Sequence, residues 1–201
     1  MQDLKKVFRL KIDAQKALSR FVSYHDMRSD SLGHGRQDYS REVKSLTAAL
    51  EGNNQSIKTV KDKMNFYLGM CYRWGVPGVA KDYPLAIKYL IKASQGSNAE
   101  FRDKAHCRLG EDYYLGLPGI EKDLEKSINH LKKVNVEYAG RAAADFYLGK
   151  CYFFGGQGIK KETARAVYHF KKVIKTGGYF RHKDKANAYM SQAYYFGSYN
   201  I

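Results

Sequence analysis

Cysteine and tryptophan are scarce in this chain of 201 residues, which has three cysteines and one tryptophan. Three cysteines are too few for a disulfide framework of the kind that holds small secreted domains together. We therefore expect Cys71, Cys107 and Cys151 to be small buried hydrophobic residues.

Long apolar runs are also missing. No stretch approaches the roughly 18 consecutive apolar residues that a membrane-spanning helix needs, so we predict no transmembrane segment. The N-terminal stretch MQDLKKVFRLKIDAQKALSRF mixes both charges and lacks the apolar core and cleavage site of a secretory signal. We expect a cytoplasmic protein, or an exported one whose signal has been removed from this sequence.

Patterns typical of a catalytic or metal site are absent as well. The turn at residues 33–35 has neither the lysine nor the strand-to-helix setting of a phosphate loop, and there is no nucleophile motif. His130 and His169 hold equivalent places on successive helices about 10 Å apart. Ligand nitrogens lie about 2 Å from a metal ion, so these two cannot share one. We predict no enzyme, no metal and no cofactor, and we expect both histidines to be packed or partly exposed.

Acidic residues are outnumbered, with 20 against 35 lysines and arginines, which gives a net charge of +15. Such a charge attracts nucleic acid, anionic lipid or an acidic protein. The excess is diffuse, because residues 1–63 carry 13 basic and 8 acidic side chains and the remainder carries 22 and 12. Diffuse charge more often serves solubility than recognition.

One stretch recurs along the chain. Its copies lie at residues 66–92, 107–133 and 146–172, and a fourth begins at residue 188. Measured between Gly69, Gly110, Gly149 and Ser191, the steps are 41, 39 and 42 residues. A nearly fixed step of this size predicts an all-α solenoid of helix-turn-helix repeats about 40 residues long, in one elongated domain.

Each repeat predicts two helices. Helix A carries apolar residues at steps of four, such as Met64, Leu68 and Tyr72. Its mid-helix glycine costs about 1 kcal/mol relative to alanine, and its recurrence predicts close approach of a neighbouring helix. Asp82 and Asp123 are placed to cap helix B, and Glu162 at the third equivalent position is a poorer cap.

The N-terminal part repeats the pattern weakly. Residues 1–30 have helical periodicity, residues 29–35 form a loop, and residues 37–49 predict the second helix of a degenerate capping repeat. We therefore divide the chain into N-terminal helices at 1–63 and, at 64–201, three full repeats plus the first helix of a fourth.

The motif A-x-x-x-L-G-x-x-Y-x-x-G, then G-V/I-x-K-D, then A-x-x-Y-L-x-K-A resembles the Sel-one-like repeat (SLR) family, a relative of the tetratricopeptide repeat. It corresponds here to residues 64–75, 78–82 and 86–93 and recurs in the two later copies. The resemblance implies a right-handed superhelix that binds another protein on its concave side and has no catalytic activity. It also implies an adaptor or scaffold, expected here to be a bacterial member with a role in host interaction, the envelope or toxin immunity.

Equivalent positions on successive A helices predict ladders of basic and aromatic side chains. Positions 63, 67, 70 and 74 share a face distinct from the core stripe, which predicts a basic, tyrosine-rich groove for an acidic protein segment. The predicted groove residues are Lys61, Lys63, Tyr67, Arg102, Lys104, Arg108, Arg141, Tyr147, Lys183, Lys185 and Tyr189. In the alternative interpretation, the tyrosines pack between adjacent A helices.

Two further partners are left open by the sequence. Tyr194, Tyr195 and Phe196 lie on the last A helix with no second helix after them, which predicts an interface with a partner or a second copy. The basic ladders also allow electrostatic binding of nucleic acid or anionic lipid, which would weaken steeply with salt.

Overall fold

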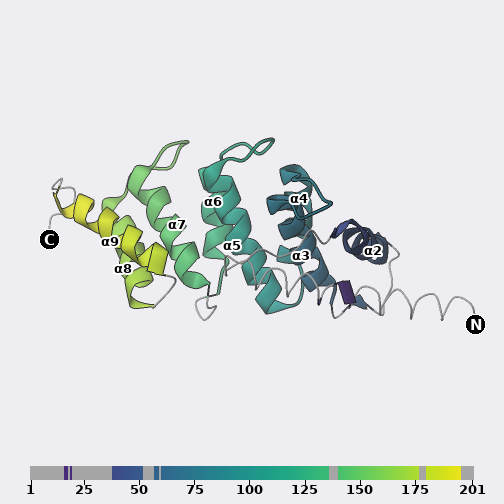
Figure 1. Ribbon diagram of the computed structural model, residues 1–201. Helices are drawn as coiled ribbons and strands as arrows, with labels where there is room; N and C mark the ends of the chain where they lie inside the picture. Colours follow the sequence, from purple (N-terminus) through teal and green to yellow (C-terminus); the bar gives the residue numbers. More distant parts are fainter. Residues whose placement is uncertain are drawn as a thin grey trace, which may run out of the picture. The chain divides into compact units, whose positions relative to one another are not determined.

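The computed structural model is built from α-helices (Figure 1). It describes residues 16–17, 19, 38–51, 57–58, 60–135, 140–176 and 180–195. Within these ranges there are eight helices and no strand: α2 Ser40–Glu51, α3 Lys61–Trp74, α4 Tyr83–Ser94, α5 Ala99–Leu115, α6 Leu124–Lys132, α7 Arg141–Phe154, α8 Thr163–Lys175 and α9 Phe180–Tyr195. Most of the predicted helix over residues 1–30, and the predicted loop after it, lie outside the described residues.

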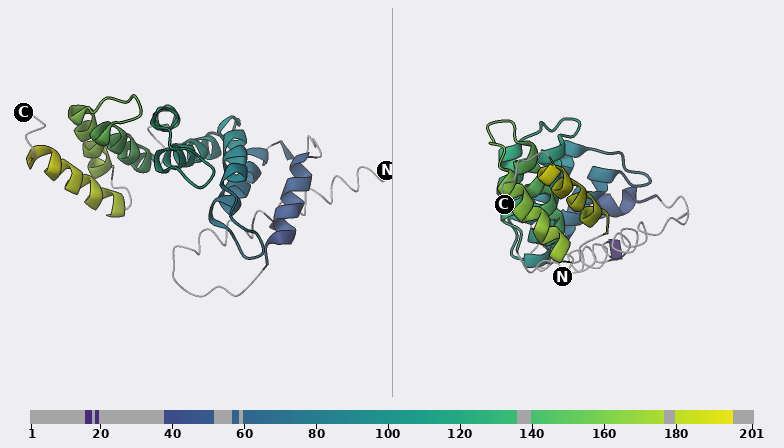
Figure 2. Two further views of the ribbon diagram at one scale, coloured as in Figure 1. Left: turned by 90° about the horizontal axis from the view of Figure 1, so that it is seen from above. Right: turned by 90° about the vertical axis from the view of Figure 1, so that its left-hand side faces the viewer.

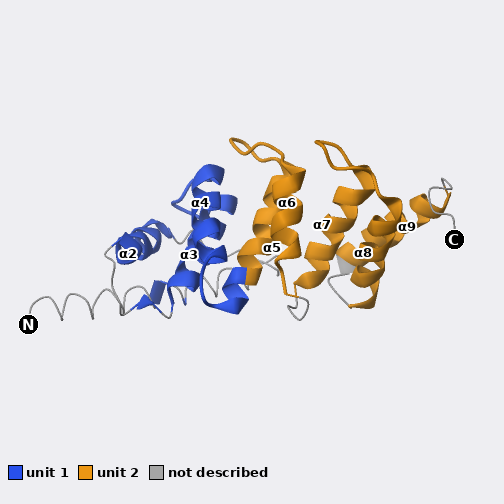
Figure 3. Ribbon diagram, turned by 180° about the vertical axis from the view of Figure 1, so that it is seen from behind, with its two compact units in different colours: residues 1–102 blue, residues 103–201 orange. Residues whose placement is uncertain are grey.

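The chain divides into two compact units, Met1–Arg102 and Asp103–Ile201, where the sequence predicted one elongated domain (Figure 3). Unit 1 holds α2, α3, α4 and the start of α5. Unit 2 holds the rest of α5 and α6 to α9. The predicted division at residue 64 separates the N-terminal helices from the three full repeats, and it stays a prediction.

A helical hairpin is the element that recurs in both units. In unit 1, α3 packs on α4, and Met64, Leu68 and Leu90 are fully buried between them. In unit 2, α7 packs on α8, and α9 contacts both (Figure 2). The apolar stripes predicted from steps of four therefore form the core of each hairpin.

The mid-helix glycines lie where the two helices of a hairpin meet. A Cβ added to Gly69 would lie 2.8 Å from Leu90 Cγ, and one added to Gly110 would lie 2.4 Å from Leu131 Cγ. At Gly149 the obstacle is the ring of Phe170, 2.5 Å away. The predicted close approach is confirmed, because none of these helix pairs has room for a side chain at this position.

A tight loop joins the helices of each hairpin. Helix A ends at a glycine with positive φ, as at Gly75 (φ 70°). A pair of backbone hydrogen bonds then closes the loop, at Val76 and Val79 in the first repeat, with counterparts in the other two. Helix B starts where Asp82 Oδ1 accepts a hydrogen bond from the Leu85 amide (2.9 Å), a cap that Asp123 repeats and Glu162 does not make.

The tip of this loop reaches back to the start of an earlier B helix. In unit 2, Gln157 accepts a hydrogen bond from the Leu124 amide (3.1 Å) and donates one to the Lys122 carbonyl (2.7 Å), so it holds the first residue of α6. In unit 1, the Tyr39 amide donates to the Pro77 carbonyl (2.8 Å) at the start of α2. These contacts fix two of the loops against an earlier helix, and the contact made by Gln157 also fixes the backbone of Lys122.

Candidate functional site

The predicted groove residues of unit 1 do not all reach the surface. Tyr67 is only 8% exposed, and its ring packs 5.5 Å from that of Phe66 and 5.9 Å from that of Phe101. Lys63 places its ammonium 5.9 Å from the centre of the Phe101 ring. The structure therefore corrects the prediction for Tyr67: an aromatic neighbour on α5 covers it, so it belongs to the core. Lys61 is exposed and Arg102 half-buried.

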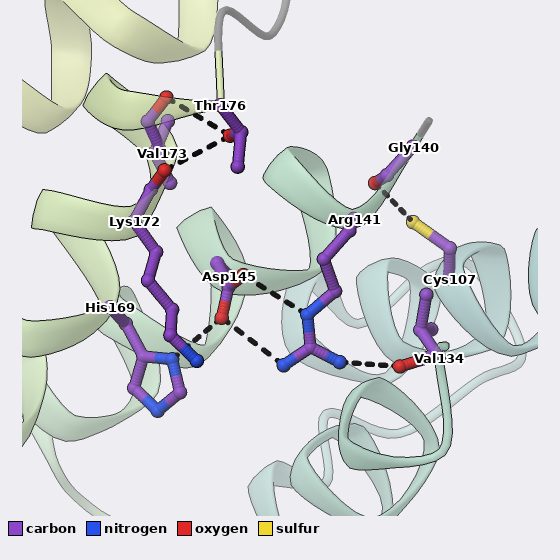
Figure 4. Close-up of polar contacts among 9 residues, drawn as sticks. All are labelled: Cys107, Val134, Gly140, Arg141, Asp145, His169, Lys172, Val173 and Thr176. Carbon is purple, nitrogen blue, oxygen red and sulfur yellow. Dashed lines mark hydrogen bonds and ion pairs between the residues drawn. The ribbon is translucent and has the colours of Figure 1, made fainter. Parts of the chain in front are cut away.

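Arg141 is also committed to the interior, in unit 2 (Figure 4). Its Nε and Nη2 donate to the carboxylate of Asp145 at 3.0 and 3.2 Å, and its Nη1 donates to the Val134 carbonyl. The Arg141 side chain is 11% exposed and that of Asp145 2%. The prediction that Arg141 lines an open groove is therefore corrected, because its guanidinium donates its hydrogen bonds to the buried Asp145 carboxylate and to the Val134 carbonyl.

Asp145 completes this buried network by accepting a hydrogen bond from His169 Nδ1 at 2.8 Å. Burial by itself would raise the pKa of Asp145. The hydrogen bonds from His169 and Arg141 outweigh that effect and hold the pKa below its usual value. The carboxylate is consequently ionised at neutral pH, and the network is a stabilising element of the fold.

The same register position is polar in every full repeat. Asn65, His106 and Asp145 each lie 24 residues before the aromatic ring of helix B. In the second repeat, Nδ1 of His106 and Nδ1 of His130 are 3.0 Å apart. The His130 ring also stacks on Tyr113 at 5.7 Å, just as His169 stacks on a tyrosine of its own repeat. The predicted packing of the two histidines is confirmed.

Burial lowers the pKa of His130 to about 4, with further contributions from His106 and Lys133. His130 is therefore neutral at neutral pH, and which of the two imidazoles donates in this contact depends on their tautomers. Across the described ranges, no group of three or more His, Cys, Asp or Glu side chains is placed to hold a metal ion.

One predicted face does reach solvent in unit 2. We define the A-helix face as the side of α5, α7 and α9 that carries these residues: Arg108, Glu111, Leu115, Tyr147, Lys150, Phe154, Lys185 and Tyr189. They are the equivalents, on later A helices, of positions 63, 67, 70 and 74, whose helical spacing predicted a shared face. The composition of this face differs from the predicted ladder of basic residues, and its role as a binding groove stays a prediction.

The tyrosines on the A-helix face connect neighbouring helices. Tyr147 of α7 donates its hydroxyl to Glu111 of α5 at 3.0 Å, and Arg108 pairs with the same carboxylate at 2.9 Å. Tyr189 of α9 stacks on Phe170 of α8 at 5.4 Å. Both tyrosines are half-buried. Tyr147 contacts an adjacent A helix, as the alternative interpretation has it, whereas Tyr189 packs both on the B helix α8 and on Phe154 of the A helix α7, at 5.7 Å.

Two large apolar side chains stand out on the same face. Leu115 is 45% exposed and Phe154 is 55% exposed, each at the end of its helix. They occupy the position equivalent to Trp74, one turn beyond Glu111 and Lys150. Sequence reasoning placed that position on the face but did not single out the two residues.

Lys150 was also not singled out. Its ammonium lies 4.4 Å from the centre of the Tyr114 ring, and 5.5 and 5.6 Å from the rings of Tyr147 and Phe146. Cation-π contacts of this kind are attractive. Because Lys150 stands alone at its ladder position in the sequence, only the spatial convergence of three rings reveals it.

The remaining predicted residues belong to α5 and α9 or follow α9. Lys183 and Lys104 are half-buried, and Lys185 is exposed. Tyr194 and Tyr195 are 39% and 85% exposed. Phe196 lies outside the described residues, so the predicted interface at α9 stays a prediction.

Comparison with known proteins agrees with this architecture. The Sel1 repeat family matches residues 63–98, 103–133 and 142–174. These segments coincide with the three helical hairpins, whose register glycines and loops the structure shows to be equivalent. The fold is an all-α helical repeat solenoid, and the chain belongs to the Sel1 repeat (SLR) family.

Two solved structures share the fold. A Sel1 repeat protein from Oxalobacter formigenes has 23% sequence identity and a TM-score of 0.61, over 92% of this chain and 64% of that one. A protective antigen of uropathogenic Escherichia coli with an SLR fold has 19% identity and a TM-score of 0.57, over 90% and 38%. The chain thus spans less than two thirds of either protein. A search of curated proteins gave no match.

Sel1 repeat proteins generally mediate interactions between proteins, and the family is typically a non-catalytic scaffold. No helix in the described ranges combines the length and apolar character that crossing a bilayer requires.

Proposed function

We propose that this protein is an adaptor that binds an acidic segment of another protein on the A-helix face of unit 2. The observation that carries the proposal is the exposure of Leu115 and Phe154 on a face where basic residues outnumber the acidic one, Glu111. Exposed apolar side chains beside polar ones are typical of protein interfaces.

The support comes from the chemistry of the face. Tyrosine and arginine, which often dominate binding energy, lie there as Tyr147 and Arg108 and are already held by Glu111. Side chains that are fixed before binding lose little entropy on association. The net charge of +15 favours a partner with excess negative charge.

Two exposed aromatic residues provide a matched test. Phe154 on α7 is 55% exposed and lies on the A-helix face, whereas Tyr168 on α8 is 56% exposed and lies on a B helix. A photo-reactive phenylalanine at each position in turn, in cells that express the protein, should crosslink a partner from position 154 and not from position 168. Mass spectrometry then identifies the partner.

The identified partner is next purified and its affinity measured by calorimetry. Phe154→Ser should weaken binding about tenfold, because an aromatic anchor is lost. Tyr168→Ser should change the affinity by less than about twofold, as expected away from an interface. Equal crosslinking from both positions, or equal losses of affinity, would contradict the proposal.

A further inference from the structure

The lysines around Tyr114 form a cluster of positive charge in unit 2. Lys150 of α7 and Lys122, in the loop before α6, place their ammonium groups 4.4 and 5.3 Å from the centre of the same Tyr114 ring. Lys185 of α9 lies one helical turn before Tyr189 on the same face and is the third member of this lysine cluster; its charge contributes to lowering the pKa of Lys150. Three separate segments therefore direct positive charge to one place on the A-helix face.

The cluster has no carboxylate partner of its own. In the part of the chain that the structure describes, none of Lys122, Lys150 and Lys185 forms an ion pair. Glu111 is the nearby acidic residue, and its two oxygens accept hydrogen bonds from Arg108 and Tyr147. Positive charge is thus in excess at this place.

The rings give the cluster a fixed geometry. Tyr114, Tyr147 and Phe146 surround Lys150, and the Gln157 side chain holds the Lys122 backbone at 2.7 Å. Burial, and then repulsion by Lys185, lower the pKa of Lys150, although it stays a cation at neutral pH. An incoming anion would relieve this repulsion.

We propose that Lys150, Lys122 and Lys185 form an anion subsite that receives a carboxylate of the partner's acidic segment, beside the apolar contacts at Leu115 and Phe154. This inference rests on the proposed function and specifies the chemistry of the ligand. Lysine and carboxylate groups form charge-assisted hydrogen bonds, which are roughly twice as strong as neutral ones. An acidic residue next to an apolar residue would match the neighbouring parts of the face.

The same geometry disfavours a nucleic acid. Single strands bind by stacking bases on open aromatic faces along a continuous basic groove. Here the Tyr114 ring carries two lysines and the Tyr189 ring stacks on Phe170.

Fluorescence anisotropy with defined probes tests the subsite. The probes are a labelled peptide of alternating glutamate and leucine, the same peptide with glutamine for glutamate, and a poly-uridine oligonucleotide of equal length, at about 0.15 M salt. Lys150→Met removes the charge and keeps an unbranched side chain against Tyr114. Lys171→Met removes an exposed lysine of α8 and is the matched control.

We expect Lys150→Met to weaken binding of the glutamate peptide about tenfold, and Lys171→Met by less than about twofold. Lys185→Met, at an exposed position where folding is not at risk, should weaken it about threefold. The glutamine peptide should bind wild-type protein about as weakly as the glutamate peptide binds Lys150→Met.

Three results would overturn the inference: equal losses for the variants at 150 and 171, tighter binding of the oligonucleotide than of the peptide, or no saturable peptide binding up to about 1 mM. Phe154→Ser separates this inference from the proposed function. If it weakens peptide binding and Lys150→Met does not, the subsite is wrong and the docking face stands. If neither variant weakens it, both proposals fail.

Discussion

The burial of His130 beside His106 should make unit 2 sensitive to mild acid. The folded state lowers the pKa of His130 from 6.5 to about 4. As pH falls below about 6.5, His130 therefore becomes protonated in the unfolded chain but stays neutral in the folded chain. The free energy of unfolding should consequently decrease between about pH 6.5 and pH 4 and should be unaffected by this group above pH 7.

The size of the effect follows from the shift. A difference of 2.5 between pKa values of 6.5 and about 4 corresponds to about 3.4 kcal/mol at 1.36 kcal/mol per unit. Because His130 is only half-buried, solvent screening reduces this, and we expect a loss of about 1.5 to 2 kcal/mol.

The first repeat supplies the matched variant. It carries Asn65 and Tyr89 at the positions of His106 and His130, and Tyr89 stacks on Tyr72 at 5.9 Å. His106→Asn together with His130→Tyr should remove the pH-dependent loss. Urea denaturation followed by circular dichroism at about pH 7.5 and pH 4.5 gives the comparison. If wild type and double variant lose the same stability, the histidine contact does not disfavour protonation and the reasoning is refuted.

Three further outcomes test the packing of the helical hairpins. Gly110→Ala should destabilise by about 1 to 3 kcal/mol, because the new methyl group would lie 2.4 Å from Leu131 Cγ, whereas Ser191→Ala at the equivalent exposed position of α9 should change stability by less than about 0.5 kcal/mol. Thermal and urea unfolding measure both. Arg141→Ala should cost about 3 kcal/mol, because it leaves a buried carboxylate with one partner fewer, and Arg165→Ala, which breaks an exposed pair, less than about 1 kcal/mol. A similar cost for the two arginines would show that the buried pair adds nothing. All three cysteines are buried, so a thiol reagent at neutral pH should label the native protein far more slowly than the urea-unfolded protein.

The helices and their contacts could be predicted because the same residue types recur at equivalent positions in three copies of the repeat. Gly69 and its two equivalents predicted a close approach, and the approach is there. Asp82 and Asp123 predicted caps, and both cap. Such rules are local in sequence, so periodicity and residue type suffice to find them.

The candidate site could be predicted only in part. Equivalent positions on successive helices indicate the direction of a side chain but not which residue it meets. Tyr67 and Arg141 were therefore predicted to face a groove, whereas Tyr67 packs against Phe101 and Arg141 pairs with Asp145. Lys150 became apparent only once rings from two helices were seen around it. The constant separation of 24 residues between the polar residue of helix A and the ring of helix B was a usable signal that sequence reasoning missed.

The reach of Gln157 to the first residue of α6 limits how this architecture can be rearranged. A hairpin that closes the start of its predecessor is not a freely exchangeable module. Deleting, duplicating or shuffling a hairpin brings a different loop tip to the start of the earlier helix, and the two would no longer form the same hydrogen bonds. Evolution by gain or loss of copies would therefore have to change the loop and the preceding helix start together, and an engineer who grafts hairpins would have to do the same.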